Sequence, residues 1–361
     1  MKRIALVGVA ILLLLVLVAY LLRGPILLRV MERTAAANLS TNLVAELPDG
    51  LHVLLCGAGS PLPDPKRSGP CTAVIAGKRL FVVDAGGGSA RVMGNNVSVR
   101  LPQGEIEGIL LTHHHSDHID GLGEVVMQRW AQGGHSSPVP VYGPEGVAEV
   151  VDGVNRAYRL SQGYRVAHHG DSVVPASGAG AVARPFAEPA DGESHAVLDD
   201  GDLRVIAFRV DHEPVSPAVG YRFDYKGRSV VISGDTTKSP NLERFAKDAD
   251  VLVHEALAAH MVEPLTDAAR AAGRDRIAKI TLDILDYHTT PVEAAEIARD
   301  AGVRHLVYNH IVPPLPFGPM EELFVEGVDE VYDGPVTVGR DGTLIRLPSG
   351  SESIEIEELL W

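Results

Sequence analysis

Hydrophobic positions divide the chain into one long apolar run near the N-terminus and a much longer region of short apolar segments. Residues 4–22 carry no charge, and a helix over them would be about 28 Å long, close to the thickness of a bilayer core. The run exceeds the core of a cleaved signal peptide, and no small-residue cleavage site follows it. We therefore expect residues 1–23 to form a transmembrane signal anchor and residues 24–48 a connecting, partly amphipathic segment.

From residue 49 to residue 361 the pattern is that of a single α/β domain. Short β-branched runs, separated by Gly, Pro and Asp, predict strands, and three longer periodic segments, residues 121–132, 256–273 and 291–302, predict helices. Early strands follow one another directly, whereas later strands alternate with helices. This mixture predicts a four-layer αββα sandwich, in which two packed sheets carry helices on their outer faces. Residues 170–202, rich in Gly, Ala, Pro and Ser, are expected to be a long loop.

Net charge and cysteine content limit the substrates and the kinds of metal site that the chain can have. The formal net charge is -15, and no basic run stands out, which argues against a nucleic-acid substrate because a polyanion needs a basic patch. The two cysteines, Cys56 and Cys71, lack the Cys-x-x-Cys spacing of a thiolate metal site. Two buried free thiols are the favoured interpretation, and a disulfide between neighbouring strands is the alternative.

The segment "THHHSDHIDG", residues 112–121, holds the most informative chemistry. It follows an apolar strand and precedes a predicted helix. His113 and His115 are two residues apart and face the same way in an extended segment, while His114 points to the other side. Asp117 and His118 lie at the turn into the helix. The segment therefore divides into two pairs of ligands, one for each of two neighbouring metal ions.

Two metal ions require further ligands, and the sequence offers them after other apolar strands. His212 follows "VIAFRV", Asp235 follows "RSVVIS", and His310 follows "RHLVYN". Loops at the ends of strands are where an α/β fold usually places its functional residues. We expect all three side chains to join the histidine segment.

Taken together, these motifs resemble the metallo-β-lactamase-fold hydrolases, over about residues 50–348. Within that superfamily the chain is most similar to the ribonuclease Z and arylsulfatase-like branch, because it has "FVVDAG" with Asp84, then "GDT", "HEA" and a histidine before the last ligand. The resemblance implies two Zn²⁺ ions, although other divalent metals are open, and a bridging hydroxide as nucleophile. It also implies the ligands, with Asp235 shared: His113, His115 and His212 for one ion, and Asp117, His118 and His310 for the other.

The same resemblance implies roles for three more residues. His288 would protonate the leaving group, Glu255 would keep it charged, and Asp117 would act in catalysis as well as in metal binding. Asp84 would tie the metal loop together through hydrogen bonds. Simpler interpretations are a helix-start residue for His288, a capping carboxylate for Glu255 and a turn-forming residue for Asp84. His168 and His169 lie outside every motif and are expected in a solvated loop.

These features predict a hydrolase of small phosphate or sulfate esters, phosphodiesterase- or arylsulfatase-like, anchored to a membrane with an extracytoplasmic catalytic domain. The alternative is a ribonuclease Z-like endonuclease that processes the 3′ end of tRNA. The acidic chain, the expected anchor and the short interval between His212 and Asp235, too short for a tRNA-gripping arm, favour the small ester. A non-catalytic scaffold is disfavoured because every matched ligand is intact. Whether the protein is a homodimer stays open.

Overall fold

The structure, a computed structural model, describes residues 2–39, 42–95 and 98–360, without the side chains of residues 2–7, 9, 10, 12 and 15. The chain forms two compact units, Met1–Asn42 and Leu43–Trp361. The first consists of one helix, α1 (Lys2–Leu39), which runs on through much of the expected connecting segment. Among the described residues, no helix combines the length and the apolar composition that a membrane span requires. The predicted transmembrane anchor, and the extracytoplasmic location that rested on it, are therefore wrong.

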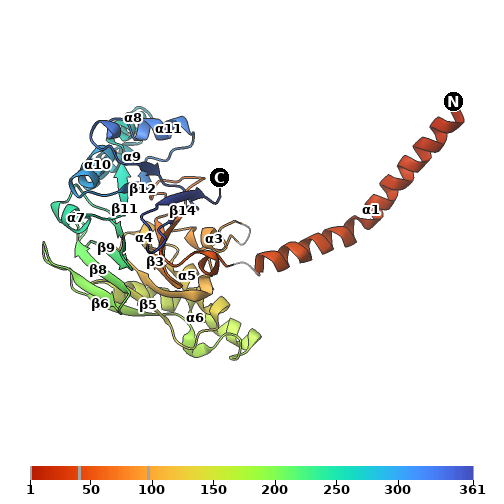
Figure 1. The fold of residues 1–361 in the computed structure, drawn as a ribbon, viewed down its shortest axis with the longest axis horizontal. Coiled ribbons are helices and arrows are strands. Elements are labelled where there is room, and N and C mark those ends of the chain that lie inside the picture. Colours follow the sequence, from red (N-terminus) through yellow and green to blue (C-terminus); the bar gives the residue numbers. More distant parts are fainter. Residues whose placement is uncertain (1, 40–41, 96–97, 361) are drawn as a thin grey trace. The chain divides into compact units, whose positions relative to one another are not determined.

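Two β-sheets form the centre of the second unit, as predicted (Figure 1). The first sheet has the strand order β15-β14-β1-β2-β3-β4-β5-β6. Its strands are β1 (Leu51–Gly57), β2 (Cys71–Ala76), β3 (Arg79–Val83), β4 (Ile106–Leu110), β5 (Val139–Pro144), β6 (Ala181–Phe186), β14 (Thr343–Arg346) and β15 (Glu355–Glu358). The second sheet has the order β13-β12-β11-β10-β9-β8-β7. Its strands are β7 (His195–Asp199), β8 (Leu203–Arg209), β9 (Val219–Tyr225), β10 (Arg228–Ile232), β11 (Val251–Leu257), β12 (His305–Val312) and β13 (Val336–Val338).

Three separate apolar clusters show the four layers. One cluster packs the first sheet against α2 (Leu43–Glu46), α3 (Ser89–Met93), α5 (Leu122–Gly133) and α6 (Val147–His169). A second fills the space between the sheets. The third packs the second sheet against α7 (Pro240–Phe245), α10 (Pro291–Asp300) and α11 (Pro319–Phe324). Because both faces of the central strands are covered, β1, β2, β11 and β12 are buried at every position.

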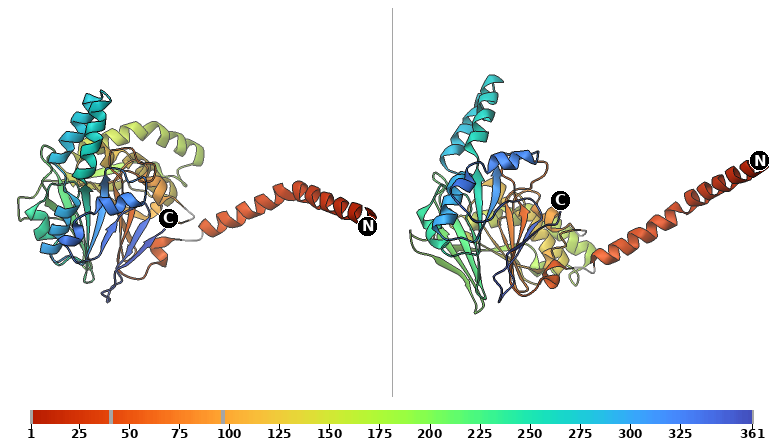
Figure 2. Two further views of the ribbon diagram at one scale, coloured as in Figure 1. Left: turned by 90° about the horizontal axis from the view of Figure 1, so that it is seen from above. Right: turned by 45° about the horizontal axis from the view of Figure 1, so that its top comes forward.

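Two helices stand apart from these layers. α8 (Ala259–Ala271) and α9 (Asp275–Asp283) pack on each other as a hairpin that projects from the body in both views of Figure 2. Short helices complete the unit: α4 (Ser116–Ile119), η1 (Gln103–Glu105), η2 (Ala176–Gly178), η3 (Ile284–Asp286) and η4 (Val328–Glu330). The helices predicted from periodicity are confirmed as α5, α8 and α10.

Cys56 and Cys71 form a disulfide, so the favoured expectation of free thiols is wrong. The bond joins the end of β1 to the start of β2, which are already paired strands, and closes the loop of residues 58–70. Asp341 holds the same loop, because its carboxylate accepts hydrogen bonds from the amides of Ala58 and Ser68 at 3.0 and 2.8 Å. The loop is thus fixed near both of its ends.

Residues 170–202 are not the single long loop that composition predicted. They contain η2 and two strands, β6 and β7, which form one edge of the first sheet and one edge of the second. The acidic C-terminal segment supplies β15, which pairs antiparallel with β14 at the opposite edge of the first sheet.

Candidate metal centre

Loops and strand ends from both sheets meet at one place in the second unit. From the first sheet, the segment after β4 carries His113 and His115, and α4 carries Asp117 and His118. From the second sheet come His212 after β8, Asp235 after β10 and His310 near the end of β12. All seven residues predicted as ligands are therefore brought together.

Their ligand atoms form groups suited to a metal ion. Within each group the candidate atoms lie within 4.8 Å of one another, and the groups are His113, His115, His212 and Asp235; Asp117, His118 and His310; and Asp235, His288 and His310. The first two groups match the division that the sequence predicts. The third shows that His288 also reaches the cluster.

Asp235 lies at the centre of this cluster. Its Oδ2 is 3.3 Å from Nε2 of both His118 and His310. The same oxygen is 3.8 Å from Nε2 of His113 and 3.9 Å from Nε2 of His212. A carboxylate facing imidazoles of both groups has the position that a shared ligand requires.

Buried atoms without hydrogen-bond partners support a divalent-metal site. His113 Nε2, His118 Nε2, His310 Nδ1 and Asp235 Oδ1 are buried and have no hydrogen-bond partner. Leaving several such atoms unsatisfied costs about 1–3 kcal/mol each, so their concentration in one cluster calls for an explanation. Nitrogen and carboxylate donors of this kind fit zinc and similar divalent cations.

Hydrogen bonds behind the cluster orient the imidazoles. His212 Nδ1 donates to the carbonyl of Tyr287 at 2.9 Å, and His118 Nδ1 donates to Asp84 Oδ2 at 2.9 Å. The Thr112 hydroxyl lies 3.1 Å from His113 Nδ1 and donates to Asp84 at 2.8 Å. Each of these three histidines thus directs its Nε2 into the cluster. Tyr287 and Thr112 are contributors that the sequence analysis missed, although each is adjacent to a motif histidine.

Burial and charge divide the histidines into two protonation classes. Burial lowers the pKa of His115 and His212, and it lowers the pKa of His113 well below its usual value. Burial also opposes the charge of His118, but the carboxylates of Asp235 and Asp84 outweigh it and raise the pKa of His118 well above the usual value. Neutral imidazole is the form that binds a metal, so His118 is the ligand that has a proton to lose.

His288 and Glu255 form a buried pair beside the cluster. His288 Nδ1 is 3.1 Å from Glu255 Oε1, and the two side chains are 6% and 2% exposed. The amides of Thr289 and Thr236 donate to the same oxygen at 3.0 and 3.3 Å, which fixes the carboxylate. Burial lowers the pKa of His288, but Glu255 more than compensates, so the pKa of His288 is raised overall.

The backbone at two of these residues is unusual. Asp84 and His310 have φ values of 57° and 44°, in the left-handed region that residues other than glycine rarely adopt. His310 lies inside β12 rather than in the loop after it, next to an irregularity in the pairing of β11 with β12. The left-handed residue redirects the strand, as is common where a side chain is aimed into a site.

Three further histidines that the sequence analysis singled out lie outside the cluster. His114 Nε2 donates to the carbonyl of Glu145 at 3.1 Å, so its ring is turned toward the start of α6. His168 and His169 are exposed at the end of α6, not in the solvated loop expected from the sequence.

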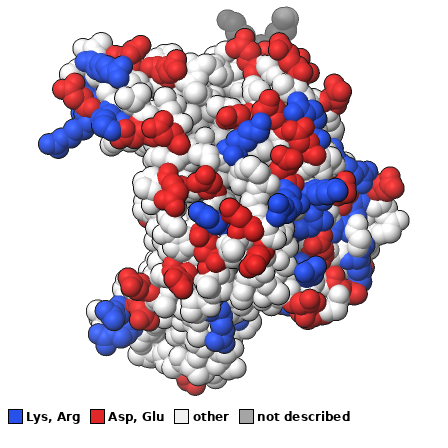
Figure 3. Space-filling model, turned by 90° about the vertical axis from the view of Figure 1, so that its left-hand side faces the viewer, with Lys and Arg blue, Asp and Glu red and all other residues white. Residues whose placement is uncertain are grey.

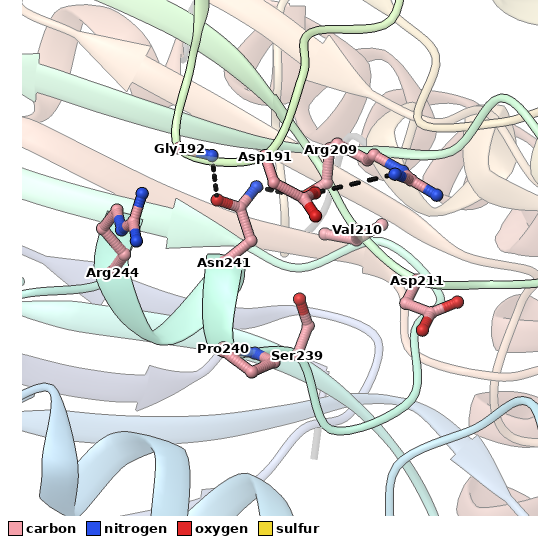
Figure 4. Close-up of a pocket in the computed structure, with 9 residues that line it drawn as sticks. All are labelled: Asp191, Gly192, Arg209, Val210, Asp211, Ser239, Pro240, Asn241 and Arg244. Carbon is pink, nitrogen blue, oxygen red and sulfur yellow. Dashed lines mark hydrogen bonds and ion pairs between the residues drawn. The ribbon is translucent and has the colours of Figure 1, made fainter.

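The cluster opens into a pocket of about 340 Å³. One side of this pocket is polar and holds Asp117, His288 and His310; the other is apolar and holds Leu62, Ile280, Ile284 and Val312. The loop of residues 58–70 supplies Leu62, α9 supplies Ile280, η3 supplies Ile284 and β12 supplies Val312. A second cavity, of about 300 Å³, shares none of these lining residues. Its Arg209 forms the ion pair with Asp191 that is marked in Figure 4, at 3.7 Å, and lies 3.5 Å from Glu188, so much of its positive charge is balanced.

Fold and site together define a metal-dependent hydrolase of ester bonds, and comparisons with known proteins agree. Residues 79–311 match the family described as "Beta-lactamase superfamily domain". Ribonuclease Z of Mycolicibacterium gilvum is 36% identical over 293 residues, which cover 81% of this chain and 94% of the relative. Ribonuclease Z of Mycobacterium tuberculosis H37Rv is 34% identical over 293 residues, covering 81% and 96%. The chain therefore belongs to the metallo-β-lactamase-fold hydrolases of the β-lactamase superfamily, in the ribonuclease Z branch.

Solved structures show the same fold. The short form of human tRNase Z aligns with a TM-score of 0.57 at 24% identity, covering 82% of this chain and 99% of the other. The metallo-β-lactamase-fold protein YhfI of Bacillus subtilis aligns with a TM-score of 0.56 at 18% identity, covering 82% and 99%. The inference from net charge that nucleic acid is not a partner is wrong, because the curated relatives are ribonucleases.

Proposed function

We propose that the protein is a ribonuclease Z-type endonuclease that hydrolyses a phosphodiester bond near the 3′ end of precursor tRNA. The observation that carries this proposal is the match to ribonuclease Z over 94% of a relative's length, in a chain that retains the complete cluster of histidines and aspartates. The short interval between His212 and Asp235, occupied by β9 and β10, does not weigh against it, because the match to these relatives is nearly end to end.

The cluster would hold two zinc ions. His113, His115 and His212 would bind one, Asp117, His118 and His310 would bind the other, and Asp235 would be shared. When bound, the two ions would supply the positive charge that lowers the pKa of a water nucleophile and stabilises charge on the phosphate. The orientation of His113, His118 and His212 by hydrogen bonds from outside the cluster supports these assignments.

Two side chains are suited to the proton transfers of hydrolysis. Water attacks phosphorus, the bond to the leaving oxygen breaks, and that oxygen needs a proton. His288 borders the pocket and is kept protonated by Glu255, so it can donate that proton. Asp117 is the more accessible carboxylate of the cluster, with a side chain 11% exposed against 2% for Asp235, and can accept the proton that the water loses.

The apolar wall of the pocket supports a second candidate function, hydrolysis of small phosphate or sulfate esters. Leu62, Ile284 and Val312 offer contacts to an aryl group, and about 340 Å³ is enough for a compact ester. These side chains can equally receive a nucleobase next to the cleaved bond, so both kinds of substrate fit the apolar wall.

A parallel assay separates the candidates. Full-length protein loaded with zinc is given end-labelled precursor tRNA with a 3′ extension, bis(p-nitrophenyl) phosphate and p-nitrophenyl sulfate, beside the Asp235→Ala variant. We expect one cut near the 3′ end of the mature tRNA sequence, with kcat/KM for RNA far above that for either small ester, and no cut by the variant. Efficient hydrolysis of a small ester with intact RNA would establish the second candidate instead.

A further inference from the structure

The pocket beside the metal centre contains neither Lys nor Arg among the described residues that line it. Figure 3 shows the Lys and Arg side chains on one face of the molecule, where they lie among Asp and Glu. The negative charge of a phosphate in the pocket would therefore be met by the metal ions, by His288 and by neutral hydrogen-bond donors. Such donors are effective in a site of this kind, because they are fixed before the charge on the phosphate is redistributed.

Tyr287 lines this pocket and is held against the cluster by both its backbone and its ring. It directly follows η3, at the base of the α8–α9 hairpin. Its carbonyl accepts a hydrogen bond from His212 Nδ1 at 2.9 Å. The centroid of its ring lies 5.1 Å from that of His212 and 4.8 Å from that of His288. The ring is therefore fixed beside a predicted metal ligand and the proposed proton donor.

The hydroxyl of Tyr287 is available to a substrate, unlike those of the buried tyrosines. Tyr221, Tyr308 and Tyr332 donate to backbone carbonyls at 2.6, 2.6 and 2.9 Å. No hydrogen bond joins the Tyr287 hydroxyl to any residue that the structure describes. Because the side chain is half-buried, the hydroxyl is not sealed inside the protein and can donate to a molecule in the pocket.

The charges around Tyr287 indicate that its hydroxyl faces the cluster. Burial raises the pKa of Tyr287 most, and the carboxylates of Asp235, Asp283 and Asp117 raise it further. Asp235 and Asp117 are predicted metal ligands and line the same pocket. A phenol has an ordinary pKa near 10, so it keeps its proton at neutral pH without any help from its surroundings. The hydroxyl therefore stays a donor throughout the reaction.

The two serines of the pocket are weaker candidates for a donor. Ser60 Oγ is buried and is shielded from a bound substrate by its neighbours. Ser116 is exposed at the start of α4. Its short side chain lacks the ring contacts that fix Tyr287 between two imidazoles.

We propose that Tyr287 is a further catalytic residue, whose hydroxyl donates a hydrogen bond to a non-bridging oxygen of the phosphate during hydrolysis. The proposal rests on the proposed function in that the substrate is a phosphate ester. No bond to Tyr287 is made or broken, and its proton stays on the phenol. A non-bridging oxygen suits this donor because it does not have to be protonated for the ester bond to break. The leaving oxygen needs a whole proton, which an imidazole supplies better than a phenol.

The test is the variant Tyr287→Phe in the full chain, because this change removes the hydroxyl and keeps the ring. Tyr158→Phe is the matched control, since Tyr158 is also half-buried but packs with Met127 and Trp130, away from the pocket. The zinc-loaded proteins are assayed for kcat and KM on precursor tRNA and on bis(p-nitrophenyl) phosphate. Calorimetry measures the binding of zinc to each protein and of inorganic phosphate to the zinc-loaded form.

We expect Tyr287→Phe to lower kcat about 10- to 100-fold on both substrates equally, because both present the same non-bridging oxygens. Inorganic phosphate should bind about 10-fold more weakly, with zinc affinity unchanged. The control should match wild type in every measurement. A kcat equal to that of wild type would overturn the role of the hydroxyl, and so would a loss of zinc affinity large enough to explain the lower rate. A loss confined to RNA would overturn it too, since the hydroxyl would then serve the leaving oxygen.

Failure of the proposed function can be told apart from failure of this assignment. If wild-type protein hydrolyses bis(p-nitrophenyl) phosphate but leaves RNA intact, the proposed function fails, and a lower kcat of Tyr287→Phe on the small ester still supports the hydroxyl. If wild-type protein hydrolyses neither substrate, the phosphate titration decides. Unchanged phosphate binding in Tyr287→Phe would then overturn the assignment.

Discussion

Asp84 Oδ2 accepts a hydrogen bond from His118 Nδ1 at 2.9 Å, and the hydroxyl of Thr112 donates to the same oxygen at 2.8 Å. Because Thr112 also contacts His113, one buried carboxylate orients histidines of both metal-binding groups. Its other oxygen accepts the amide of Thr112 at 2.9 Å. Asp84 therefore links the end of β3 to the segment after β4 and fixes the direction in which two imidazoles present Nε2.

Asp84→Asn should weaken zinc binding about 10- to 100-fold, because an amide of the same shape puts an NH2 donor in place of one accepting oxygen. It can therefore keep either the bonds from His118 and the Thr112 hydroxyl or the bond from the Thr112 amide, but not all three. Competition with a chromophoric chelator measures the change. Asp49→Asn is the matched control, since Asp49 also accepts side-chain hydrogen bonds but lies far from the cluster, with Tyr225 and Lys226. Unchanged zinc affinity in Asp84→Asn would show that the ligands hold their orientation without it.

Zinc binding should release a proton near neutral pH. The pKa of His118 is raised well above its usual value, so this ring carries a proton that zinc must displace. Zinc affinity should therefore fall as the pH is lowered. Calorimetric titration in buffers of different ionisation enthalpy would count the protons released, and a binding enthalpy independent of the buffer would contradict the expectation.

Glu255→Gln should move the alkaline limb of activity to lower pH. The Glu255 carboxylate is what keeps the pKa of His288 raised against burial, so its removal lets His288 lose its proton earlier as pH rises.

His288→Ala should cost about 10²- to 10⁴-fold in kcat on RNA, whose leaving oxygen needs a proton. The same substitution should cost far less on bis(p-nitrophenyl) phosphate, whose leaving group is already stable as an anion. Equal losses on both substrates would remove His288 from the role of general acid.

His305 should make the second unit, Leu43–Trp361, sensitive to acid at a place remote from the pocket. Burial lowers the pKa of His305 to about 4, against an ordinary value near 6.5. Between these values the unfolded chain binds the extra proton, so the free energy of unfolding falls as the pH drops from about 6.5 toward about 4. The pKa difference corresponds to about 3 kcal/mol, which solvent screening reduces to about 1–2 kcal/mol.

The variant His305→Gln cannot titrate in this window and should lose less stability on acidification. Urea unfolding at pH 7.5 and pH 5, with EDTA present for both proteins, measures the difference. Parallel loss of stability in the two proteins would contradict the assignment to His305.

Much of the site could be predicted because its residues follow apolar strands whose ends meet. His212 and Asp235 lie where that rule places them, after β8 and β10. The position of His310 inside β12 could not be predicted, since a left-handed φ of 44° in a strand leaves no trace in the hydrophobic pattern. Helix α6 was missed because its apolar stripe, at Val147, Val150, Val151 and Val154, is largely confined to its first half, and only Val147 and Val151 are fully buried. The edge strands β6 and β7 are only partly buried or exposed at most positions, and neither has an apolar run.

The candidate metal centre draws its ligands from both sheets, and this has a mechanical consequence. His113, His115, Asp117 and His118 belong to the first sheet, whereas His212, Asp235 and His310 belong to the second. Bound ions would therefore act as a cross-link at one rim of the sandwich, in addition to the apolar contacts between the layers. Zinc at about 1,000 times its Kd would add about 4 kcal/mol to the free energy of unfolding. Thermal unfolding with and without chelator measures this effect, and an unchanged Tm would show that the two halves hold together without the metal.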